Sequence, residues 1–139
     1  MEFVTKGPEE TQNLGRKIAA DITGGEIFAL TGDLGSGKTT FVQGLAQGLN
    51  ISKRVISPSF IIMRIYDLGE KKFYHVDLYR LEEKIDTEIA NLGLKDVWGK
   101  PENIVVIEWA EKIKKLIPKN AKWIKFENLK ENERRIIIQ

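Results

Sequence analysis

The chain has 139 residues, of which 42% are apolar, enough for one buried core and too few for two ordinary domains. Its 22 basic and 20 acidic residues nearly cancel, so the charge does not indicate a nucleic-acid binder. The lack of cysteine and the single histidine exclude disulfides and the usual zinc sites. No basic leader opens the sequence, and no apolar run approaches the roughly 18 residues of a membrane span, so we expect a cytoplasmic protein without membrane contact.

The first third of the chain predicts a helix, a strand and a second helix. Pro8 suits a first helical turn, and apolar residues then recur every four positions up to Ile22, which predicts a helix that ends at the following glycine pair. The apolar run 26–31 is typical of a strand buried on both faces of a parallel sheet. After the glycine-rich segment 32–37, apolar residues at helical spacing predict a helix over 38–50.

The middle of the chain predicts a hairpin, a helix and another buried strand. Residues 60–66 and 72–79 are β-branched and aromatic runs on either side of a short turn, which predicts an antiparallel pair. Apolar residues at helical spacing predict a helix over 81–92. The four apolar residues 104–107 predict a strand that ends abruptly at Glu108.

The last part of the chain predicts a short helix over 110–117, stopped by Pro118, and terminal strands at 123–126 and 136–138. Strands that alternate with helices indicate an α/β fold, and the hairpin indicates that its mostly parallel sheet is mixed. We therefore expect a mixed sheet flanked by helices, in a single domain over residues 1–139.

The segment from Gly32 to Thr39 carries the strongest chemical signal. It has two glycines separated by four residues and followed by Lys and Thr, the Walker A pattern of P-loop nucleotide-binding proteins, and it lies between a predicted strand and a predicted helix. Loop amides and the helix dipole would bind phosphates, the Lys38 ammonium would reach the β- and γ-phosphates of ATP, and the Thr39 hydroxyl would ligate Mg²⁺. The residues expected at the phosphates are Asp33, Gly35, Ser36, Gly37, Lys38, Thr39 and Thr40.

Two downstream carboxylates are candidates for the metal site, because magnesium in such sites usually needs a carboxylate at a neighbouring strand's end. Glu108 directly follows the buried strand, although Asp is the usual residue there and a solvated glutamate is the alternative. Asp77 either serves the metal or a water molecule, or forms an ion pair with Arg80. Spacing decides neither role.

Two further features are open to both a functional and a structural interpretation. His75 is expected in the core or at the edge of its strand rather than as a proton shuttle. Ser57 and Ser59 flank a proline in a segment that either orders around a γ-phosphate or forms a plain turn.

Tryptophans and lysines are expected in structural positions. The three tryptophans are expected in the core or an interface, although Trp109 follows Glu108 directly and is therefore placed near the nucleotide. A solvated helix face is expected for Lys112, Lys114 and Lys115.

Taken together, these motifs resemble the TsaE (also called YjeE) family across nearly the whole chain. The segments that carry the resemblance are the helix with Thr11 and Leu14-Gly15, the run 32–41, Ser57-Pro58-Ser59-Phe60, His75-Val76-Asp77-Leu78-Tyr79-Arg80-Leu81, and Glu108-Trp109. Two residues depart from the expected family pattern: Ser59 stands for threonine and keeps the hydroxyl, and Val76 stands for the frequent phenylalanine.

The resemblance implies an ATPase needed to form N6-threonylcarbamoyladenosine in tRNAs that read codons beginning with A. It implies that TsaB and TsaD are partners, that the link to tRNA is indirect, and that the isolated ATPase is weak and stimulated by the TsaB–TsaD complex. It also implies a magnesium site at Thr39 and Glu108, catalytic roles for Lys38, Asp77 and Glu108, and a position for Thr11 near the adenine.

Three other functions share parts of this pattern. A small-molecule kinase would need a second substrate pocket and a basic lid, and the sequence has no arginine-rich lid. A GTP-dependent switch is disfavoured because the Asp-Val-Trp-Gly run at 96–99 does not follow an apolar strand and no Asn-Lys-x-Asp guanine reader is present. A module that binds ATP without productive hydrolysis remains the third alternative.

Overall fold

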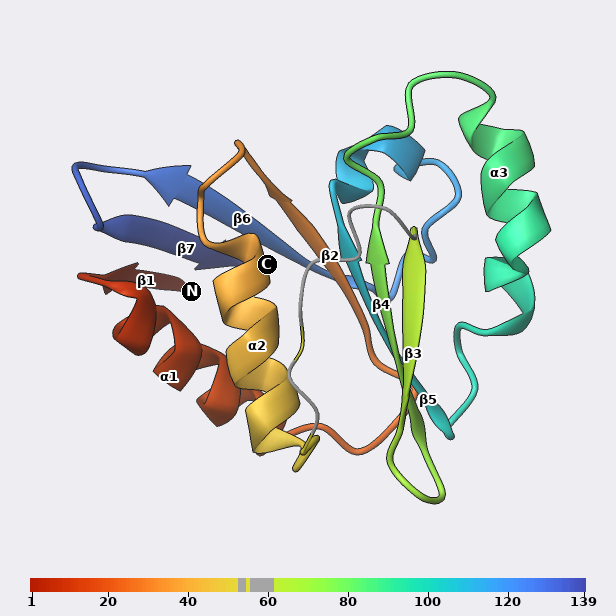
Figure 1. The fold of residues 1–139 in the computed structure, drawn as a ribbon, viewed down its shortest axis with the longest axis horizontal. Helices are drawn as coiled ribbons and strands as arrows, with labels where there is room; N and C mark the ends of the chain where they lie inside the picture. The colour runs from red at the N-terminus through yellow and green to blue at the C-terminus, as the bar shows by residue number, and fades with distance from the viewer. Residues whose placement is uncertain (53–54, 56–61) are drawn as a thin grey trace.

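The structure is a computed structural model that describes residues 1–52, 55 and 62–139, and the described strands form one sheet (Figure 1). The strand order is β1-β7-β6-β2-β5-β4-β3. The strands are β1 (Glu2–Thr5), β2 (Ile27–Gly32), β3 (Met63–Asp67), β4 (Lys72–Asp77), β5 (Asn103–Glu108), β6 (Lys122–Asn128) and β7 (Arg134–Ile138). The helices are α1 (Pro8–Ala19), α2 (Lys38–Gly48) and α3 (Ile85–Leu92), with short 3₁₀ helices η1 (Leu94–Asp96) and η2 (Ala110–Ile113).

The sheet is parallel at its centre and antiparallel at both sides. β2 pairs in parallel with both β5 and β6, and β4 pairs in parallel with β5. β3 joins β4 as an antiparallel hairpin, while β7 lies antiparallel to both β6 and β1. The expected α/β fold with a mixed sheet and flanking helices is therefore confirmed, and the strand ends that carry Asp77 and Glu108 meet at one edge because β4 and β5 run in the same direction.

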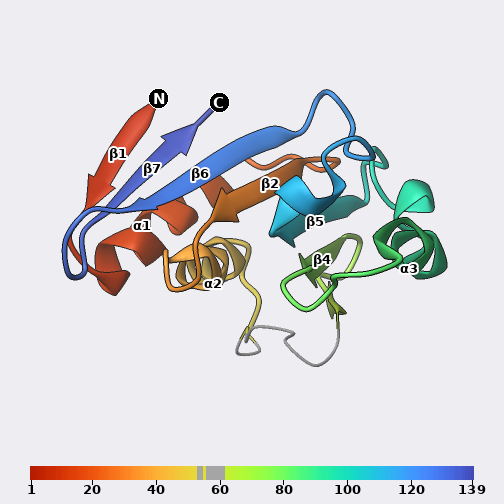
Figure 2. The same cartoon turned by 90° about the horizontal axis from the view of Figure 1, so that it is seen from above.

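Helices cover both faces of the sheet, and the alternation along each strand separates two cores. In β2, Phe28 and Leu30 belong to the core under α1 and α2, whereas Ile27 and Ala29 belong to the core under α3 and η2. Figure 2 shows α1 and α2 side by side against one face. Full burial of a side chain such as Phe28 contributes about 1.5–3 kcal/mol to the stability of the folded protein. Because β2 is buried on both faces, it holds the start of the following loop in a fixed position.

The two helices on the first face pack very closely because glycine lies at their crossing. A Cβ atom on Gly44 of α2 would lie 2.1 Å from the Gln12 carbonyl oxygen of α1, closer than atoms can approach. This contact fixes α1 against α2 and thereby brings Thr11 near the start of α2.

The structure changes the predicted limits of several elements. The first helix ends at Ala19 rather than at the glycine pair Gly24-Gly25. Helix α3 starts at Ile85 because Leu81 belongs to a turn, in which its amide donates to the Leu78 carbonyl. The predicted helix 110–117 is only the 3₁₀ helix η2, and residues 60–61 of the predicted first hairpin strand lie outside the described residues.

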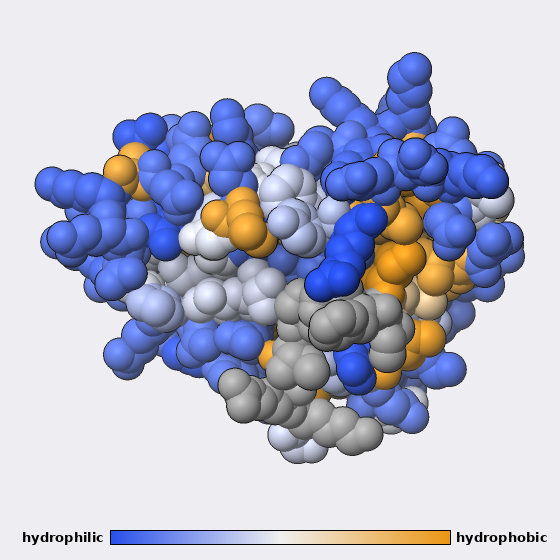
Figure 3. Space-filling view, turned by 45° about the horizontal axis from the view of Figure 1, so that its top comes forward, coloured by the Kyte–Doolittle hydropathy of each residue, from blue (hydrophilic) through white to orange (hydrophobic). Residues whose placement is uncertain are grey.

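The surface of the molecule is uneven in hydropathy, and its helices are short. Apolar side chains gather on the side of the molecule where β3 and α3 lie, while the surface on the side of α1 and β7 is mostly hydrophilic (Figure 3). Within residues 1–52, 55 and 62–139, each helix is too short or too polar to cross a membrane.

Candidate functional site

A cavity of about 340 Å³ opens at the carboxyl edge of the parallel strands. Its floor is the loop between β2 and α2 together with the first turn of α2. The walls come from α1, from the ends of β4 and β5, and from the β6–β7 hairpin, and the lining side chains from these elements include Thr11, Asp77, Tyr79, Arg80, Glu108, Trp109, Asn132 and Arg134. Its volume lies in the range of small-ligand sites, which is about 300–1,000 Å³.

The glycine loop takes the conformation that its sequence requires. Gly37 has a φ of 99° directly before α2, a value that side chains strongly disfavour. The Ser36 amide donates to the Asp33 carbonyl at 3.1 Å, which closes the turn. The start of α2 then presents its unpaired amide groups and the positive end of the helix dipole toward the cavity, an arrangement that favours anions.

Lys38 lies inside the loop rather than in solvent. Only 4% of its surface is exposed, and its Nζ donates to the Gly32 carbonyl, to the Asp33 carbonyl at 2.8 Å and to Ser36 Oγ at 3.2 Å. Burial lowers the pKa of Lys38 below its usual 10.5, and four carboxylates oppose that shift. In decreasing order of effect, they belong to Glu108, Glu111, Asp77 and Asp33.

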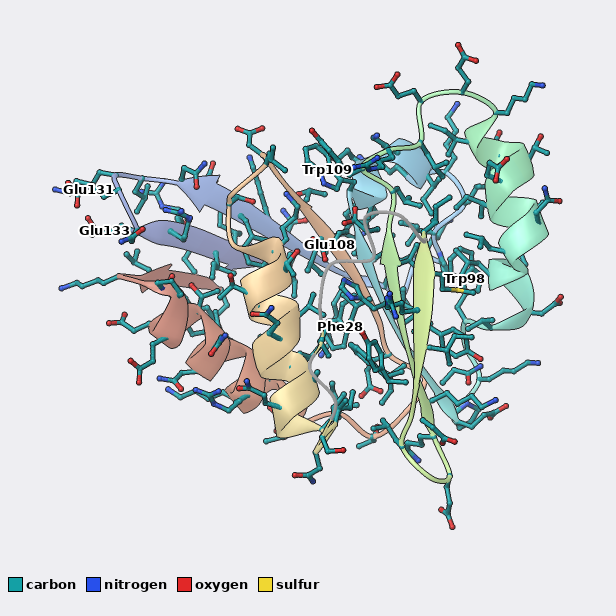
Figure 4. All side chains as sticks on the ribbon, viewed as in Figure 1. Phe28, Trp98, Glu108, Trp109, Glu131 and Glu133 are labelled. Carbon is teal, nitrogen blue, oxygen red and sulfur yellow. The ribbon has the colours of Figure 1, made fainter. Side chains whose placement is uncertain are left out.

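Thr39 and Glu108 are brought together by the fold although 69 positions separate them in the chain. The Thr39 hydroxyl donates to both oxygens of Glu108, at 3.0 Å and 3.2 Å. Glu108 is 2% exposed, so it is not a solvated strand-end glutamate. Figure 4 shows Glu108 at the end of its strand beside the first turn of α2.

These two side chains fit a magnesium ion. A hydroxyl and a carboxylate are hard oxygen ligands of the kind that Mg²⁺ prefers, and such sites complete their coordination with water and substrate phosphates. The described residues contain no group of three or more His, Cys, Asp or Glu side chains that could hold a metal ion. Thr39 and Glu108 would therefore supply only part of the coordination of a magnesium ion.

Asp77 lies next to Glu108 on the neighbouring strand. The two residues are register partners in the β4–β5 pair, and Asp77 is 8% exposed. Its Oδ1 accepts a hydrogen bond from the Tyr79 amide at 3.0 Å, which fixes the carboxylate at the cavity wall. Arg80 lines the same cavity.

Most of the remaining predicted site residues line the cavity. Thr11 is buried and lines it, with its hydroxyl 2.7 Å from that of Thr5. Gly35, Ser36, Gly37 and Thr40 also line it. Asp33 is exposed and does not line the cavity, and it contributes its carbonyl to Lys38. Ser57 and Ser59 lie outside the described residues.

Trp109 lies at the cavity, as the sequence predicts. The Lys38 Nζ lies 4.3 Å from the centre of its ring, and the Tyr79 ring packs on it with centres 5.2 Å apart. Its backbone has a φ of 61°, so the chain turns sharply where β5 ends. A lysine over an indole face is a favourable cation–π pair.

Three residues make contacts that were not predicted from the sequence. His75 is fully buried as expected for a core residue, but its Nε2 lies 2.6 Å from Glu108 Oε2. Arg134 donates to the Gly35 carbonyl at 3.1 Å, which joins the β6–β7 hairpin to the loop. The prediction of a solvated Lys112 is wrong, because its Nζ donates to the carbonyls of Leu78, Tyr79 and Leu81 at 2.8–3.0 Å.

A signal for His75 was present in the sequence. His75 and Asp77 lie two residues apart in one predicted strand and so share a face, and Glu108 ends another strand. Parallel pairing of the two strands places all three side chains on one face. No comparable short-range pattern marks Arg134 or Lys112, since their partners are backbone carbonyls from distant segments.

Comparisons with known proteins point to one family. A family model described as threonylcarbamoyl adenosine biosynthesis protein TsaE matches residues 5–136. The tRNA threonylcarbamoyladenosine biosynthesis protein TsaE of Bacillus subtilis is 37% identical over 136 residues, which are 98% of this chain and 83% of that protein. The protein of the same name from Treponema pallidum is 32% identical over 139 residues, 99% of both chains.

A solved structure is similar as well. The crystal structure of Bacillus subtilis YdiB superposes with a TM-score of 0.80 at 32% sequence identity, covering 98% of this chain and 82% of that one. The family match includes the loop and both strands that carry carboxylates.

Proposed function

The chain belongs to the TsaE family, and from this membership and the site we propose that it binds ATP with Mg²⁺ and hydrolyses it in the formation of tRNA N6-threonylcarbamoyladenosine. The observation that carries the proposal is the contact between Thr39 and Glu108. In this contact a hydroxyl at the start of α2 meets a buried carboxylate, and such a pair commonly supplies the protein ligands of a nucleotide-bound magnesium ion.

The loop and Lys38 are proposed to bind the phosphates. Backbone amides at the start of α2 supply donors at close range, and the Lys38 ammonium supplies a mobile positive charge. Lys38 now donates to loop carbonyls and to Ser36, and phosphate oxygens would replace these neutral acceptors with charged ones. Thr40 at the cavity wall would add an α-phosphate donor.

Thr39 and Glu108 are proposed as the metal ligands. When bound, magnesium neutralises negative charge that the phosphates gain during transfer. The protein would keep Glu108 buried and directed at Thr39, so that bulk water does not solvate the carboxylate in place of the metal.

Asp77 is proposed to hold the attacking water, as a third catalytic residue beside Lys38 and Glu108. Its position beside Glu108 on the neighbouring strand puts a second carboxylate at the cavity wall, and the Tyr79 amide holds it in place. A fixed carboxylate can orient a water molecule and accept its proton.

The wider role follows from the family. We propose that residues 1–139 act as one ATPase domain in the cytoplasm, that TsaB and TsaD are its partners, and that its link to tRNA is indirect. Thr11, which lines the cavity from α1, is proposed to lie near the adenine. The isolated activity would be weak, and the partners would stimulate it.

The test is phosphate release from ATP by the purified chain, alone and with TsaB and TsaD of the same organism. We expect slow release by the chain alone and faster release in the mixture. Equal release in both samples would contradict the proposed partnership, and no release in either would favour a module that binds ATP without hydrolysis. Transfer of the phosphate to a small acceptor instead of water would favour a kinase.

A further inference from the structure

His75 and Glu108 form a buried polar pair on two neighbouring parallel strands. The distance from His75 Nε2 to Glu108 Oε2 is 2.6 Å, and their side chains are 0% and 3% exposed. His75 is the register partner of Val106, two residues before Glu108, so both side chains lie on the face of the sheet that α2 covers. Glu108 therefore lines the cavity, and His75 lies directly behind it in the core.

The direction of the hydrogen bond follows from the ionised form of Glu108 that a magnesium ligand requires. An ionised carboxylate can only accept, so the imidazole donates from Nε2. The other ring nitrogen, Nδ1, is buried and has no partner among the residues that the structure describes. A hydrogen bond to a charged group in a dry interior is short and strong, and it restricts how the carboxylate can rotate.

Glu108 is held from its other side by Thr39. The Thr39 hydroxyl donates to Oε1 at 3.0 Å and to Oε2 at 3.2 Å, and the imidazole holds Oε2. The carboxylate thus lies between a rigid imidazole in the core and a hydroxyl at the cavity. Residues behind a metal ligand commonly orient it in this way, and their loss typically lowers metal affinity about 10–100-fold.

We propose that His75 is a positioning residue for the magnesium site, whose Nε2–H holds the Glu108 carboxylate toward Thr39. The proposal rests on the proposed function, since it assigns His75 a role toward the metal that Thr39 and Glu108 would hold. It differs from a purely structural role, in which His75 would only fill the space between β4 and α2.

A matched pair of substitutions separates the two roles. His75→Gln keeps an N–H donor at nearly the position of Nε2, whereas His75→Met has similar length and no donor. The measurement is the binding of a fluorescent ATP analogue at increasing Mg²⁺ concentrations, together with binding in EDTA and the thermal melting of each variant.

We expect His75→Met to raise the Mg²⁺ concentration for half-maximal effect about tenfold or more, His75→Gln to restore most of this loss, and binding in EDTA to stay unchanged. A purely structural role would lower the melting temperatures and leave the Mg²⁺ requirement of the folded protein as in the wild type. An unchanged requirement in His75→Met, or a defect in His75→Gln as large as in His75→Met, would overturn the proposal. If the wild type itself binds no nucleotide, the proposed function fails instead.

A second measurement needs no variant. His75 is the only histidine in the chain, so the nitrogen resonances of a histidine-labelled sample belong to this residue alone. We expect nuclear magnetic resonance to find a proton on Nε2. An Nε2 without a proton would overturn the proposal even if a substitution at this position prevented folding.

Discussion

The phosphate loop and the polar strand ends face each other across one cavity, but they are built in opposite ways. The loop is a continuous segment between β2 and α2, and its proposed phosphate donors are mainly backbone amides. The strand ends bring together side chains that lie 33 positions apart, as in the pair of His75 and Glu108. The loop can be recognised from its amino-acid sequence. The cluster at the strand ends forms only when β4 and β5 pair.

The two regions also differ in how their residues depend on one another. In the loop, each amide is proposed to bind phosphate independently, and Lys38 donates to carbonyls of the same segment. At the strand ends, Glu108 contacts both Thr39 and His75, so a change in one side chain alters the others. Substitutions in the two regions should therefore separate nucleotide binding from the use of the metal.

The largest effect is expected from Glu108→Gln, which removes the charge and keeps the shape. Phosphate release should fall about a hundredfold or more, because Glu108 is a proposed ligand of the metal and such a metal supplies several kcal/mol of charge stabilisation. ATP binding without Mg²⁺ should persist, since the loop is intact. Phosphate release and analogue binding in EDTA would be measured on the same samples.

The control is Glu102→Gln, which changes an exposed glutamate just before the opposite end of β5. It should release phosphate as the wild type does. Equal losses of nucleotide binding and of hydrolysis in Glu108→Gln would break the distinction between the two regions.

An intermediate effect is expected from Lys112→Met. Lys112 donates to three carbonyls in the turn after β4, the turn that carries Tyr79 and Arg80 to the cavity. Loss of these charged donors should cost about 1–3 kcal/mol of the free energy of unfolding and slow phosphate release about tenfold. Chemical unfolding and phosphate assays check both values.

The matched control is Lys114→Met, on the exposed side of the same segment. It should change neither quantity appreciably, because exposed charges away from a network contribute little. If both lysine variants behaved alike, the three carbonyl contacts would have no importance for the site.

The smallest effect concerns the pH dependence of stability at Lys38. Burial lowers the pKa of Lys38 in the folded protein below 10.5, so between the two values the unfolded chain binds more protons than the folded one. The free energy of unfolding of the wild type, relative to Lys38→Met, should therefore rise with pH in that window, by at most about 1.4 kcal/mol per pH unit. Below the window the difference should be constant. Chemical unfolding of both proteins at a series of pH values measures it, and a relative stability that falls with rising pH would contradict the buried position of the ammonium group.

The difference between the continuous loop and the strand ends also explains how much of the fold and of the site could be predicted from the sequence. Gly37 and Lys38 lie in a local pattern that needs only a strand before it and a helix after it, so the loop was predicted with its flanking elements. Glu108 was predicted at a strand end because its strand is a continuous apolar run. The short edge strand β1 was not predicted, since four residues without clear alternation pair only because β7 is beside them.

The contacts made by distant side chains could not be predicted from local patterns. His75 was expected only as a core or edge residue, because a single histidine in a strand does not indicate which neighbour it meets. The contact of Arg134 with Gly35 depends on the return of the chain in the β6–β7 hairpin, 99 positions after the loop. Such contacts follow from strand order, and several orders are compatible with the same apolar pattern.

The central claim is that Mg²⁺-ATP binds where β2 turns into α2. Calorimetric titration of Mg²⁺-ATP into the intact protein tests it most directly, with the double variant Lys38→Ala and Thr39→Ala as the comparison. We predict clear uptake by the wild type and none detectable by the folded double variant, because the ammonium and the metal's hydroxyl ligand are both lost. No uptake by the wild type, or equal uptake by both proteins, would contradict the account.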